Sequence, residues 1–562
     1  MFKKLFSFLD KKTKTQILSI QFIFILTTIL EFLNLNFLLA FLISIFSRNK
    51  FETSVPFFDF LNFKIFNSYS TSEIGIFLVI IFFLSSSFIL LSNFIIFYYS
   101  NFLKAKLTNT YFLRSLDTDY FYILDKGVSG IIHDVNNEIP KISDGVILPI
   151  LRMLNKLFLL IAILFFLLTS FFNITIKLLF ISIIMIFIFY IVLKKFFYDF
   201  GQKVSISQNN VIKSLHDTFS NIQTIKIFKI EKFFVNKVFD NLKIYSKYQS
   251  LGYLFGGIPK FFFELLSISL VTFVLIYFSK NAQIEIENII PAVGTFAFVG
   301  YRLLPIFQEI FHSLSLIKNS QYSINRILNK NLFQTKSKKI EKYKSFNGKI
   351  NKIQISSLNF KYPKTKKYIF KNFSVSFEKN KITTVTGKSG TGKTTLMNIL
   401  NGLIVPQKIK FKINGKEISN KDYYKIIKSK FSYNDQRPNL FDTSIKNNIT
   451  LEFDSKIYKK NKFIKSLKNA SLFNEINKFN ETVGSGGLKL SGGQIQRLLI
   501  ARALYHQKNI LIYDEPTNFL DQKNKFKIIG SIKKIKKDKI IVILSHDKDI
   551  LKISDKIINI KR

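Results

Sequence analysis

The sequence contains no cysteine in its 562 residues, so disulfide bridges and metal sites built on thiolates are excluded. This absence is compatible with every cellular compartment and identifies none of them. Acidic residues are scarce as well. The chain has 36 Asp and Glu against 82 Lys and Arg, which gives a formal net charge of +46.

The excess of positive charge has two interpretations. One is nucleic-acid binding, but the lysines are scattered along the chain and no nucleic-acid-binding module accompanies them. The chain is also rich in Lys, Ile, Phe and Asn and poor in Ala and Gly, which is typical of AT-biased coding. We therefore expect no nucleic-acid partner. Beside a membrane, the same charge sets the orientation of a chain and contacts anionic lipid headgroups.

Apolar residues gather in the first part of the chain and form stretches long enough to span a bilayer, which takes about 20 helical residues. The first stretch is too long for the apolar part of a signal peptide, and no small-residue cleavage site follows it. We expect it to remain as the first transmembrane helix. The six stretches cover approximately residues 17–46, 74–99, 146–171, 174–197, 251–279 and 289–311.

The connections between these stretches predict how the chain is oriented. Residues 100–145 and 198–250 are long, polar and Lys-bearing, whereas the other connections are short and carry few positive charges. The positive-inside rule then places the N-terminus, both long connections and the C-terminal half in the cytoplasm. We expect a multi-pass protein of the cell inner membrane or plasma membrane, with helices that continue from the bilayer into the long connections.

A change of sequence pattern predicts a multidomain fold. Residues 1–330 predict an all-α transmembrane domain of six helices, and the polar, Lys-rich residues 331–347 predict a linker. Residues 348–562 alternate β-branched, strand-like runs with helical patterns. This alternation indicates an α/β domain with a largely parallel sheet.

The α/β domain contains a phosphate-binding loop, or P-loop. The run "GKSGTGKTT" matches G-x-x-x-x-G-K-[ST], follows the strand-like run "ITTVT" and precedes a helical run. In such a loop the glycines let the backbone wrap the phosphates, the lysine reaches the β- and γ-phosphates, and the hydroxyl after it ligates Mg²⁺. The sequence therefore predicts an ATP site of the P-loop NTPase type that uses Mg²⁺, with Lys393 and Thr394 in these two roles. The site consists of Gly387, Lys388, Ser389, Gly390, Thr391, Gly392, Lys393, Thr394 and Thr395.

Two further strand-like runs end in polar side chains. "NILIYDEP" ends at Asp514, which can hold the Mg²⁺ shell, and Glu515, which can polarise the attacking water as a general base. "ILSHD" ends at His546, placed to contact the γ-phosphate. Alone, such a carboxylate pair is often a solvated turn and such a histidine is often structural. The P-loop in the same domain favours the catalytic interpretation.

A second turn also predicts an anion site. Ser491, Gly492 and Gly493 open the amphipathic helical pattern of "KLSGGQIQRLLIARAL". Free backbone N–H groups and the helix dipole at such an N-terminus both favour an anion. One domain would therefore hold two phosphate-binding helix N-termini.

These motifs together resemble the nucleotide-binding domain of ABC transporters over about residues 350–562. The P-loop, the signature "LSGGQ", "YDEPTNFLD" and the histidine of "SHD" stand in the family's order. The resemblance implies that Tyr362 of "FKYP" stacks on adenine, that Gln436 of "SYNDQRPNLF" is the Q-loop residue near Mg²⁺ and the catalytic centre, and that Asp521 lies in the D-loop. The implied signature residues are Leu490, Ser491, Gly492, Gly493 and Gln494.

The resemblance also explains the second anion site. In this family two nucleotide-binding domains meet head to tail, so the signature of one chain caps the γ-phosphate held by the P-loop of the other. A chain with a single such domain must pair to hydrolyse ATP. We expect a homodimer, with a heterodimer as the alternative.

The first 330 residues resemble the transmembrane domain of type I exporters, also termed type IV. "TVGSGGLKLSGG" and "YRLLP" further resemble bacterial lipid-linked-oligosaccharide flippases. One departure is Ser485, which stands where many exporters have a glutamate that contacts the coupling helices. Coupling at this position would then use backbone contacts or other side chains.

Ionisable residues inside the apolar stretches are candidates for the substrate path, because buried charge is costly in lipid. The planar donors of Arg302 suit a pyrophosphate headgroup, but a structural pair of Arg302 with Glu31 or Glu264 is the alternative. Arg152 and Lys156 have the alternative of extending toward headgroups. The candidates are Glu31, Arg152, Glu264 and Arg302.

The sequence thus predicts a membrane-embedded ATPase that exports or flips an amphiphile, such as a lipid-linked oligosaccharide or a lipid. Multidrug or peptide export is the alternative within transport. A soluble ABC ATPase acting on nucleic acid or ribosomes is opposed by the six apolar stretches. A non-hydrolysing regulator is opposed by the presence of Glu515 and His546.

Overall fold

The computed structural model describes residues 11–46, 70–118, 120–170, 172–280, 286–328 and 348–560, except for 364, 421, 424–425, 427–429, 436–439, 454–457, 476–479 and 519. The chain divides into two compact units. The first unit comprises residues 1–118 and 122–337, and the second comprises residues 119–121 and 338–562.

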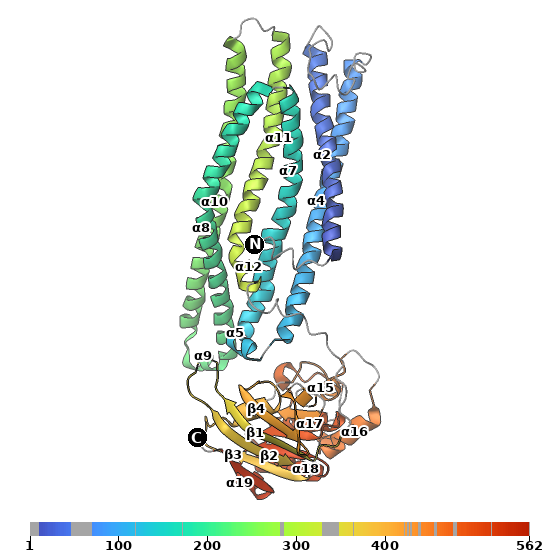
Figure 1. Ribbon diagram of the computed structural model, residues 1–562, viewed down its shortest axis with the longest axis vertical. Coiled ribbons are helices and arrows are strands. Elements are labelled where there is room, and N and C mark those ends of the chain that lie inside the picture. The colour runs from blue at the N-terminus through green and yellow to red at the C-terminus, as the bar shows by residue number, and fades with distance from the viewer. Residues whose placement is uncertain are drawn as a thin grey trace. The chain divides into compact units, whose positions relative to one another are not determined.

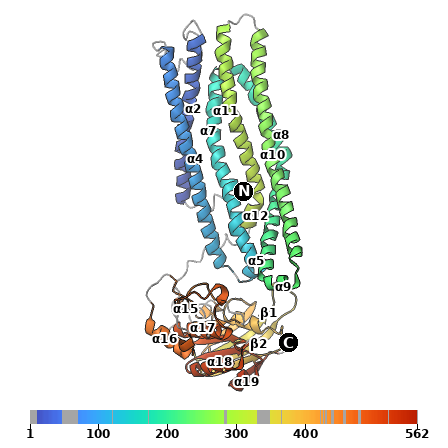
Figure 2. The ribbon, with the colours of Figure 1, turned by 180° about the vertical axis from the view of Figure 1, so that it is seen from behind.

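The first unit consists of long helices that run side by side (Figure 1), and the view from behind in Figure 2 shows the same arrangement. Short π-helical turns, η2 (Asp134–Glu138) and η3 (Ser143–Ile147), interrupt the stretch before α7. The described α-helices of this part of the chain are α2 (Lys11–Phe46), α4 (Thr71–Leu116), α5 (Tyr120–His133), α6 (Ile139–Ile142), α7 (Leu148–Ser170), α8 (Phe172–Ser220), α9 (Ile222–Phe228), α10 (Glu231–Lys280), α11 (Ile286–Asn319) and α12 (Gln321–Leu328).

The predicted apolar stretches lie mainly on α2, α4, α7, α8, α10 and α11. Among the described residues, three helical segments are long and apolar enough to cross a membrane, namely Thr15–Leu42, Thr71–Leu116 and Tyr120–Thr169. As expected from their spacing, α4 and α8 continue past the apolar stretches as polar helix. The polar connections before α7 and after α8 are therefore helical extensions.

Apolar side chains from several helices form the interior of the first unit. Phe24 of α2, Leu103 of α4 and Val146 of η3 belong to one buried cluster. Leu35 of α2 and Phe166 of α7 belong to a second cluster. The residues of the second cluster lie within the apolar stretches, and lipid is as apolar as their side chains, so these contacts stabilise the bundle by close packing and not by removal from water.

The second unit contains two sheets. The larger is a five-stranded parallel sheet in the order β6 (Phe431–Asn434), β7 (Ile510–Asp514), β8 (Ile540–Leu544), β3 (Lys381–Thr386) and β9 (Lys556–Asn559). Strands β7 and β8 are buried at every residue, which explains their continuous apolar sequences. The largely parallel sheet is therefore confirmed.

A four-stranded antiparallel sheet, which the sequence patterns did not distinguish, adds a second layer. Its order is β2 (Phe370–Glu378), β1 (Lys352–Phe360), β4 (Lys408–Ile413) and β5 (Lys416–Ile418). Strand β1 alternates buried and less buried residues over much of its length, as expected when one face packs on a core.

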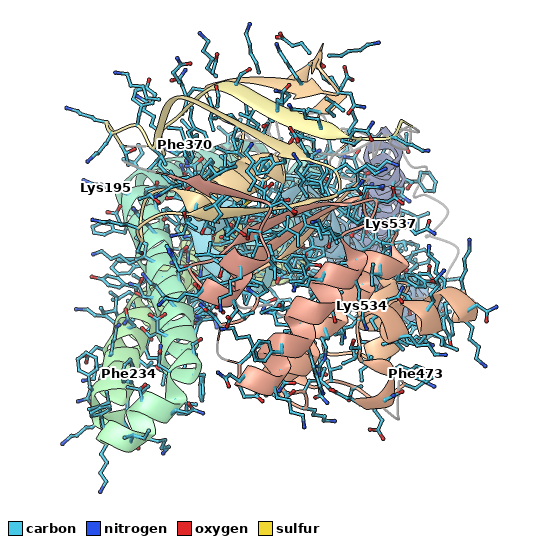
Figure 3. All side chains as sticks on the ribbon, turned by 90° about the horizontal axis from the view of Figure 1, so that it is seen from below. Lys195, Phe234, Phe370, Phe473, Lys534 and Lys537 are labelled. Carbon is cyan, nitrogen blue, oxygen red and sulfur yellow. The ribbon has the colours of Figure 1, made fainter. Side chains whose placement is uncertain are left out.

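The second unit also contains six described α-helices and two 3₁₀ turns. Lys534 and Lys537, near the C-terminal end of α18, are exposed and labelled in Figure 3. The described helices of this part are α13 (Lys393–Leu400), α15 (Ile445–Thr450), α16 (Lys460–Asn469), α17 (Gly492–Tyr505), α18 (Gln522–Ile535) and α19 (Lys548–Lys552), with 3₁₀ turns η4 (Phe473–Glu475) and η5 (Ser485–Gly487).

Candidate functional site

The predicted P-loop connects β3 to α13. Gly392 precedes the helix with φ of 102°, in the region that side chains rarely adopt. A Cβ atom at Gly392 would lie 2.5 Å from Cγ2 of Ile369, so the backbone has no room for a side chain. Lys393 and Thr394 are the first two residues of α13, whose free N–H groups suit phosphate oxygens.

The Lys393 side chain folds back over this loop. Its Nζ donates to the carbonyl oxygens of Gly387 at 2.5 Å and Lys388 at 3.3 Å. The same Nζ lies 3.0 Å from Nε2 of His546, which follows β8. The lysine and the histidine therefore meet at the ends of two neighbouring parallel strands, β3 and β8.

Asp514 ends β7 and is only 8% exposed. The Tyr433 hydroxyl donates to its Oδ2 at 3.2 Å. Burial raises the pKa of Asp514 to about 6, and burial also raises the pKa of Tyr433. A nearby cation would favour the ionised form of Asp514, since opposite charge lowers the pKa of a carboxyl group.

Glu515 lies next to Asp514 but in a different environment. Its φ is 46°, unusual for a non-glycine residue, and its N–H donates to the carbonyl of Leu544 at 2.9 Å. The Asn518 side-chain amide donates to its carboxylate. These contacts attach Glu515 to the end of β8 and hold its carboxylate against Asn518.

The residues present fit Mg²⁺ and ATP. Thr394 supplies an exposed hydroxyl and Asp514 a carboxylate, both of which are oxygen ligands that Mg²⁺ prefers. Among the described residues there is no group of three or more His, Asp or Glu that could by itself hold a metal ion. This suits Mg²⁺ in nucleotide sites, which is held by one or two protein groups together with substrate phosphates.

Two of the remaining predicted nucleotide contacts, Tyr362 and Asp521, lie within the described residues. The Tyr362 hydroxyl is 2.8 Å from Oγ1 of Thr395, and its ring centroid is 5.2 Å from that of Phe360. Asp521 precedes α18, where its carboxylate accepts from the Asn524 amide. Gln436 lies outside the described residues.

The predicted signature turn begins α17. The Ser491 hydroxyl accepts from the Gln494 N–H at 3.3 Å, and the Gln494 side chain accepts from the Ser491 N–H at 2.9 Å. This reciprocal capping box leaves Gly492 and Gly493 in the first helical turn with N–H groups available for an anion. The backbone at Ser485 forms the 3₁₀ turn η5 nearby in sequence.

The signature turn and the P-loop belong to separate hydrogen-bond networks. Among the described residues, no hydrogen bond or ion pair joins Ser491–Gln494 to Gly387–Thr395. The buried Arg497 anchors α17 elsewhere, by an ion pair with Glu475 and a 3.2 Å hydrogen bond to Asn524. One unit thus presents two helix N-termini that suit an anion and belong to separate hydrogen-bond networks.

In the first unit, all four candidate substrate-path residues have a partner of opposite charge. Arg302 of α11 lies 3.4 Å from Glu31 of α2, which matches one of the two structural pairs considered from sequence. Nη1 of Arg302 and Oε1 of Glu31 form an ion pair but not a hydrogen bond. Oε1 of Glu31 and Nε of Arg302 have no hydrogen-bond partner among the described residues. Glu264 lies 3.8 Å from Lys260 on the same helix.

Arg152 also has an acidic partner, which the sequence analysis missed. Its Nη1 lies 3.3 Å from Oε1 of Glu309 on α11, 157 positions away. Glu309 lies within the sixth apolar stretch. Because a charge in the membrane is costly, its presence there could have identified it as a functional or paired residue. Tyr433 and Asn518 were missed as well. Tyr433 is the first residue of "YND" and Asn518 the last residue of "DEPTN", and these positions were the available signals.

A helical membrane unit followed by a unit with a P-loop and a parallel sheet defines a class of membrane proteins that carry a nucleotide-binding domain. The family model described as the ABC transporter transmembrane region matches residues 11–301, and the model described as ABC transporter matches residues 370–518. The chain belongs to the ABC transporter family.

Individual relatives are distant. The chain is 28% identical to a putative export ATP-binding/permease protein of Rickettsia bellii, over 64% of this chain and 63% of that protein. It is also 28% identical to the multidrug resistance-like ATP-binding protein MdlA of Buchnera aphidicola, over 66% of this chain and 65% of that protein. It is 27% identical to the ATP-dependent lipid A-core flippase of Haemophilus influenzae over 52% of this chain and 50% of that protein. The chain thus matches less than two thirds of the length of each.

A solved structure shares the fold over nearly the whole chain. It is a bacterial Atm1-family ABC exporter with ATP bound, with a TM-score of 0.80 and 15% identity. The match covers 98% of this chain and 94% of that one. The multidomain fold expected from sequence, a helical transmembrane domain followed by an α/β P-loop domain, is therefore confirmed.

Proposed function

We propose that this chain is one half of an ATP-hydrolysing transporter that works as a pair of identical chains. The observation that carries this proposal is the separation of the P-loop at α13 from the capped N-terminus of α17 within one unit. Each helix N-terminus suits a phosphate, yet the two belong to separate hydrogen-bond networks. Two copies arranged head to tail would bring the α17 turn of one chain to the nucleotide of the other.

Each site residue has a role in this proposal. The loop from Gly387 to Thr395 holds the ATP phosphates, while Thr394 and Asp514 hold Mg²⁺, which neutralises charge on the phosphates. Glu515 accepts a proton from the attacking water, and His546 contacts the γ-phosphate. Lys393 leaves the carbonyl of Gly387 to reach the β- and γ-phosphates. Tyr362 stacks on adenine, Asp521 forms the D-loop, and Gln436 acts beside Mg²⁺.

The cargo in this proposal is an amphiphile, such as a lipid or a lipid-linked oligosaccharide, moved across the cytoplasmic membrane. The motif resemblance to lipid-linked-oligosaccharide flippases and the relative named as a lipid A-core flippase support this class. The Lys-bearing connections support a cytoplasmic location for the second unit. The pairing of Arg302 with Glu31 means that charge recognition by Arg302 would require this pair to open.

Reconstitution in proteoliposomes tests the function. We expect ATP hydrolysis that a flipped lipid or polyprenyl-linked sugar stimulates, together with ATP-dependent movement of that lipid between leaflets. Drugs related to multidrug substrates form the comparison set, because one relative is named as multidrug resistance-like. Stimulation and transport of drugs alone would replace the lipid cargo by a drug cargo. Absence of ATP hydrolysis under all conditions would overturn the proposal.

A further inference from the structure

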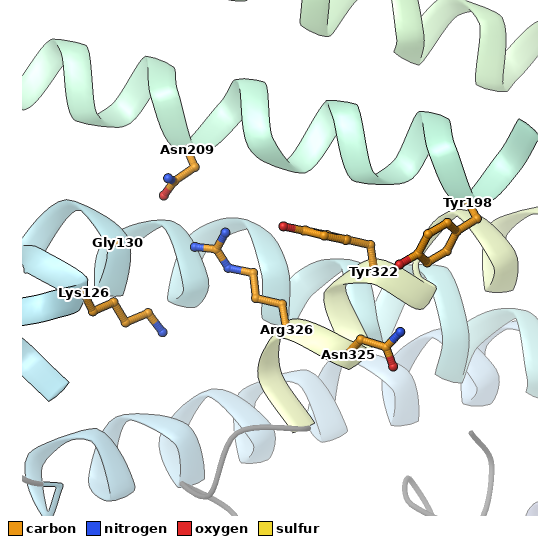
Figure 4. A pocket seen from close by; sticks show the side chains of 7 residues that line it. All are labelled: Lys126, Gly130, Tyr198, Asn209, Tyr322, Asn325 and Arg326. Atoms are coloured by element: carbon orange, nitrogen blue, oxygen red, sulfur yellow. The ribbon is translucent and has the colours of Figure 1, made fainter. Parts of the chain in front are cut away.

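A pocket of about 430 Å³ lies within the first unit. It is formed between α5, α8 and α12, on the polar helical segments beyond the apolar stretches (Figure 4). Its volume lies within the usual range for small-molecule sites, about 300–1,000 Å³. The side chains that line it are Lys126, Tyr198, Asn209, Tyr322, Asn325 and Arg326, beside the backbone of Gly130.

The pocket has a surplus of positive charge. Two lining residues, Lys126 and Arg326, share one carboxylate, that of the fully buried Asp134. Arg326 donates from Nε to Oδ1 at 3.0 Å, and the Tyr111 hydroxyl donates to Oδ2 at 2.6 Å. Asp134 is thus fully engaged, and the lining itself contains no acidic side chain.

Several hydrogen-bond donors of the lining are uncommitted. Within the described part of the chain, Nε is the one guanidinium atom of Arg326 that has a hydrogen-bond partner, so the two terminal nitrogens are available. The side chains of Asn209 and Tyr322 likewise have no partner among the described residues. Figure 4 shows the guanidinium of Arg326, the amide of Asn209 and the hydroxyl of Tyr322 pointing toward one another.

We propose that this pocket binds a phosphate monoester carried on a polar organic body. A phosphate monoester has a charge of about −1.5 to −2 and three strong acceptor oxygens, which match a donor-rich lining with surplus positive charge. The planar guanidinium of Arg326 binds two such oxygens side by side. The volume exceeds that of a lone phosphate, and the two tyrosine rings provide flat surfaces for the rest of the ligand.

The ligand can come from solution, as a sugar or glycerol phosphate, or from the bilayer, as a lipid whose headgroup is a phosphate monoester. Both sources share the recognised chemistry. Occupancy would connect α5, α8 and α12, and α12 is the last described helix before the second unit begins. The site is separate from the ATP site and does not depend on the identity of the cargo.

The test uses the full-length protein in nanodiscs, with the nucleotide site saturated by a non-hydrolysable ATP analogue and Mg²⁺. Binding of glycerol 3-phosphate is measured by calorimetry in phosphatidylcholine nanodiscs. Binding of phosphatidic acid is measured by its retention on the purified protein against phosphatidylcholine. Saturation by glycerol phosphate identifies a soluble ligand, and selective retention of phosphatidic acid identifies a lipid ligand.

Asn209→Asp introduces a carboxylate into the pocket without removing a partner of Asp134. We expect it to weaken binding at least tenfold, whereas Asn210→Asp, on the exposed neighbouring residue, leaves binding unchanged. Arg326→Lys keeps the charge but loses the planar donor pair, and we expect it to weaken binding by a similar factor. Thermal unfolding checks that each variant is folded. Equal binding by Asn209→Asp and Asn210→Asp, or no binding of either probe to the unmodified protein, would overturn the proposal.

Discussion

The Nζ atom of Lys393 lies 3.0 Å from Nε2 of His546, although 153 positions separate the two residues. They meet because β3 and β8 are adjacent parallel strands whose carboxyl ends reach the same edge of the sheet. The P-loop lysine and the histidine proposed to contact the γ-phosphate therefore face one point. Glu515 also reaches this edge, through its N–H contact with Leu544.

Replacement of the proposed general base should separate ATP binding from hydrolysis. We expect Glu515→Gln to bind ATP with unchanged affinity while turnover falls about 10²- to 10⁴-fold, because a general base typically contributes that much. The measurements are nucleotide binding and phosphate release. Glu417→Gln, on the exposed strand β5, is the matched control and should hydrolyse ATP normally. Full turnover by Glu515→Gln would contradict the assignment.

Dimers assembled from two chains with different substitutions test whether each nucleotide is bound by both chains. Ser491→Asp keeps a residue type that caps helices well but places a carboxylate near the γ-phosphate, and Lys393→Ala weakens the P-loop. With the two changes on different chains, both defects fall in one composite site and the other stays intact. With both changes on one chain beside an unmodified partner, each composite site has one defect.

We therefore expect ATP hydrolysis and nucleotide retention when the two changes lie on different chains, and neither when they lie on one chain. If each chain used only its own signature turn, the results would be reversed. That reversal would reject the head-to-tail arrangement while leaving the P-loop assignment in place.

A side chain at Gly392 should disturb the nucleotide loop. We expect Gly392→Ala to weaken ATP binding by at least tenfold, since the new Cβ would lie 2.5 Å from Ile369 and the backbone must shift. Gly415→Ala is a suitable control because Gly415 has φ of 85° but open space around its Cβ position. Both variants incur backbone strain of about 1–2 kcal/mol. Only Gly392→Ala should lose ATP affinity, and equal affinities would contradict the close-packing argument.

The ion pair of Arg302 and Glu31 can be examined by a double-mutant cycle. We expect Arg302→Met alone to destabilise the detergent-solubilised protein by up to about 3 kcal/mol, because Glu31 is left buried without its partner. Adding Glu31→Leu should restore most of the melting temperature. Lys260→Met, which removes the exposed partner of Glu264, should have little effect.

Transport by the restored double variant then decides the role of Arg302. Normal transport would show that the pair is structural, whereas loss of transport with retained basal ATP hydrolysis would indicate that Arg302 contacts the cargo. If the effects of Arg302→Met and Glu31→Leu on stability were simply additive, the ion pair itself would be contradicted.

His506, which follows α17, predicts a pH dependence of stability. Burial lowers the pKa of His506, with additional repulsion from Lys508 and Lys462. The unfolded chain takes up the proton near pH 6.5, but the folded chain does not, so stability is lost as the pH falls through 6.5. The melting temperature should therefore drop more between pH 7.5 and 5.5 for the unmodified protein than for His506→Gln. Equal drops would contradict this contribution.

Contiguous motifs allowed much of the nucleotide-binding unit to be predicted. "GKSGTGKTT" combines a glycine turn with a helix start directly after strand β3. Strands β7 and β8 are continuous apolar runs typical of a buried parallel sheet. The antiparallel sheet was not distinguished, since its pairing of β1 with β4 depends on contacts between residues 49 to 60 positions apart. Periodicity shows which face of a strand is buried but not which strand lies beside it.

Partners of charged side chains were the least predictable feature. Arg152 and Glu309 lie 157 positions apart, and Arg326 and Asp134 lie 192 positions apart. Each of these side chains has a plausible alternative, such as extending toward solvent or headgroups. The choice depends on the packing of helices that the sequence does not place relative to one another. The candidate pocket beside Arg326 could therefore be recognised only in three dimensions.

The capping box at Ser491 and Gln494 has a consequence for assembly of two chains. The first turn of α17 is already ordered within an isolated chain, because both halves of the box come from the same helix. Arrival of a second copy with its nucleotide would therefore not require the turn to fold at that moment, and little conformational entropy would be lost there. Such pre-organisation would favour rapid closure of the proposed pair on ATP.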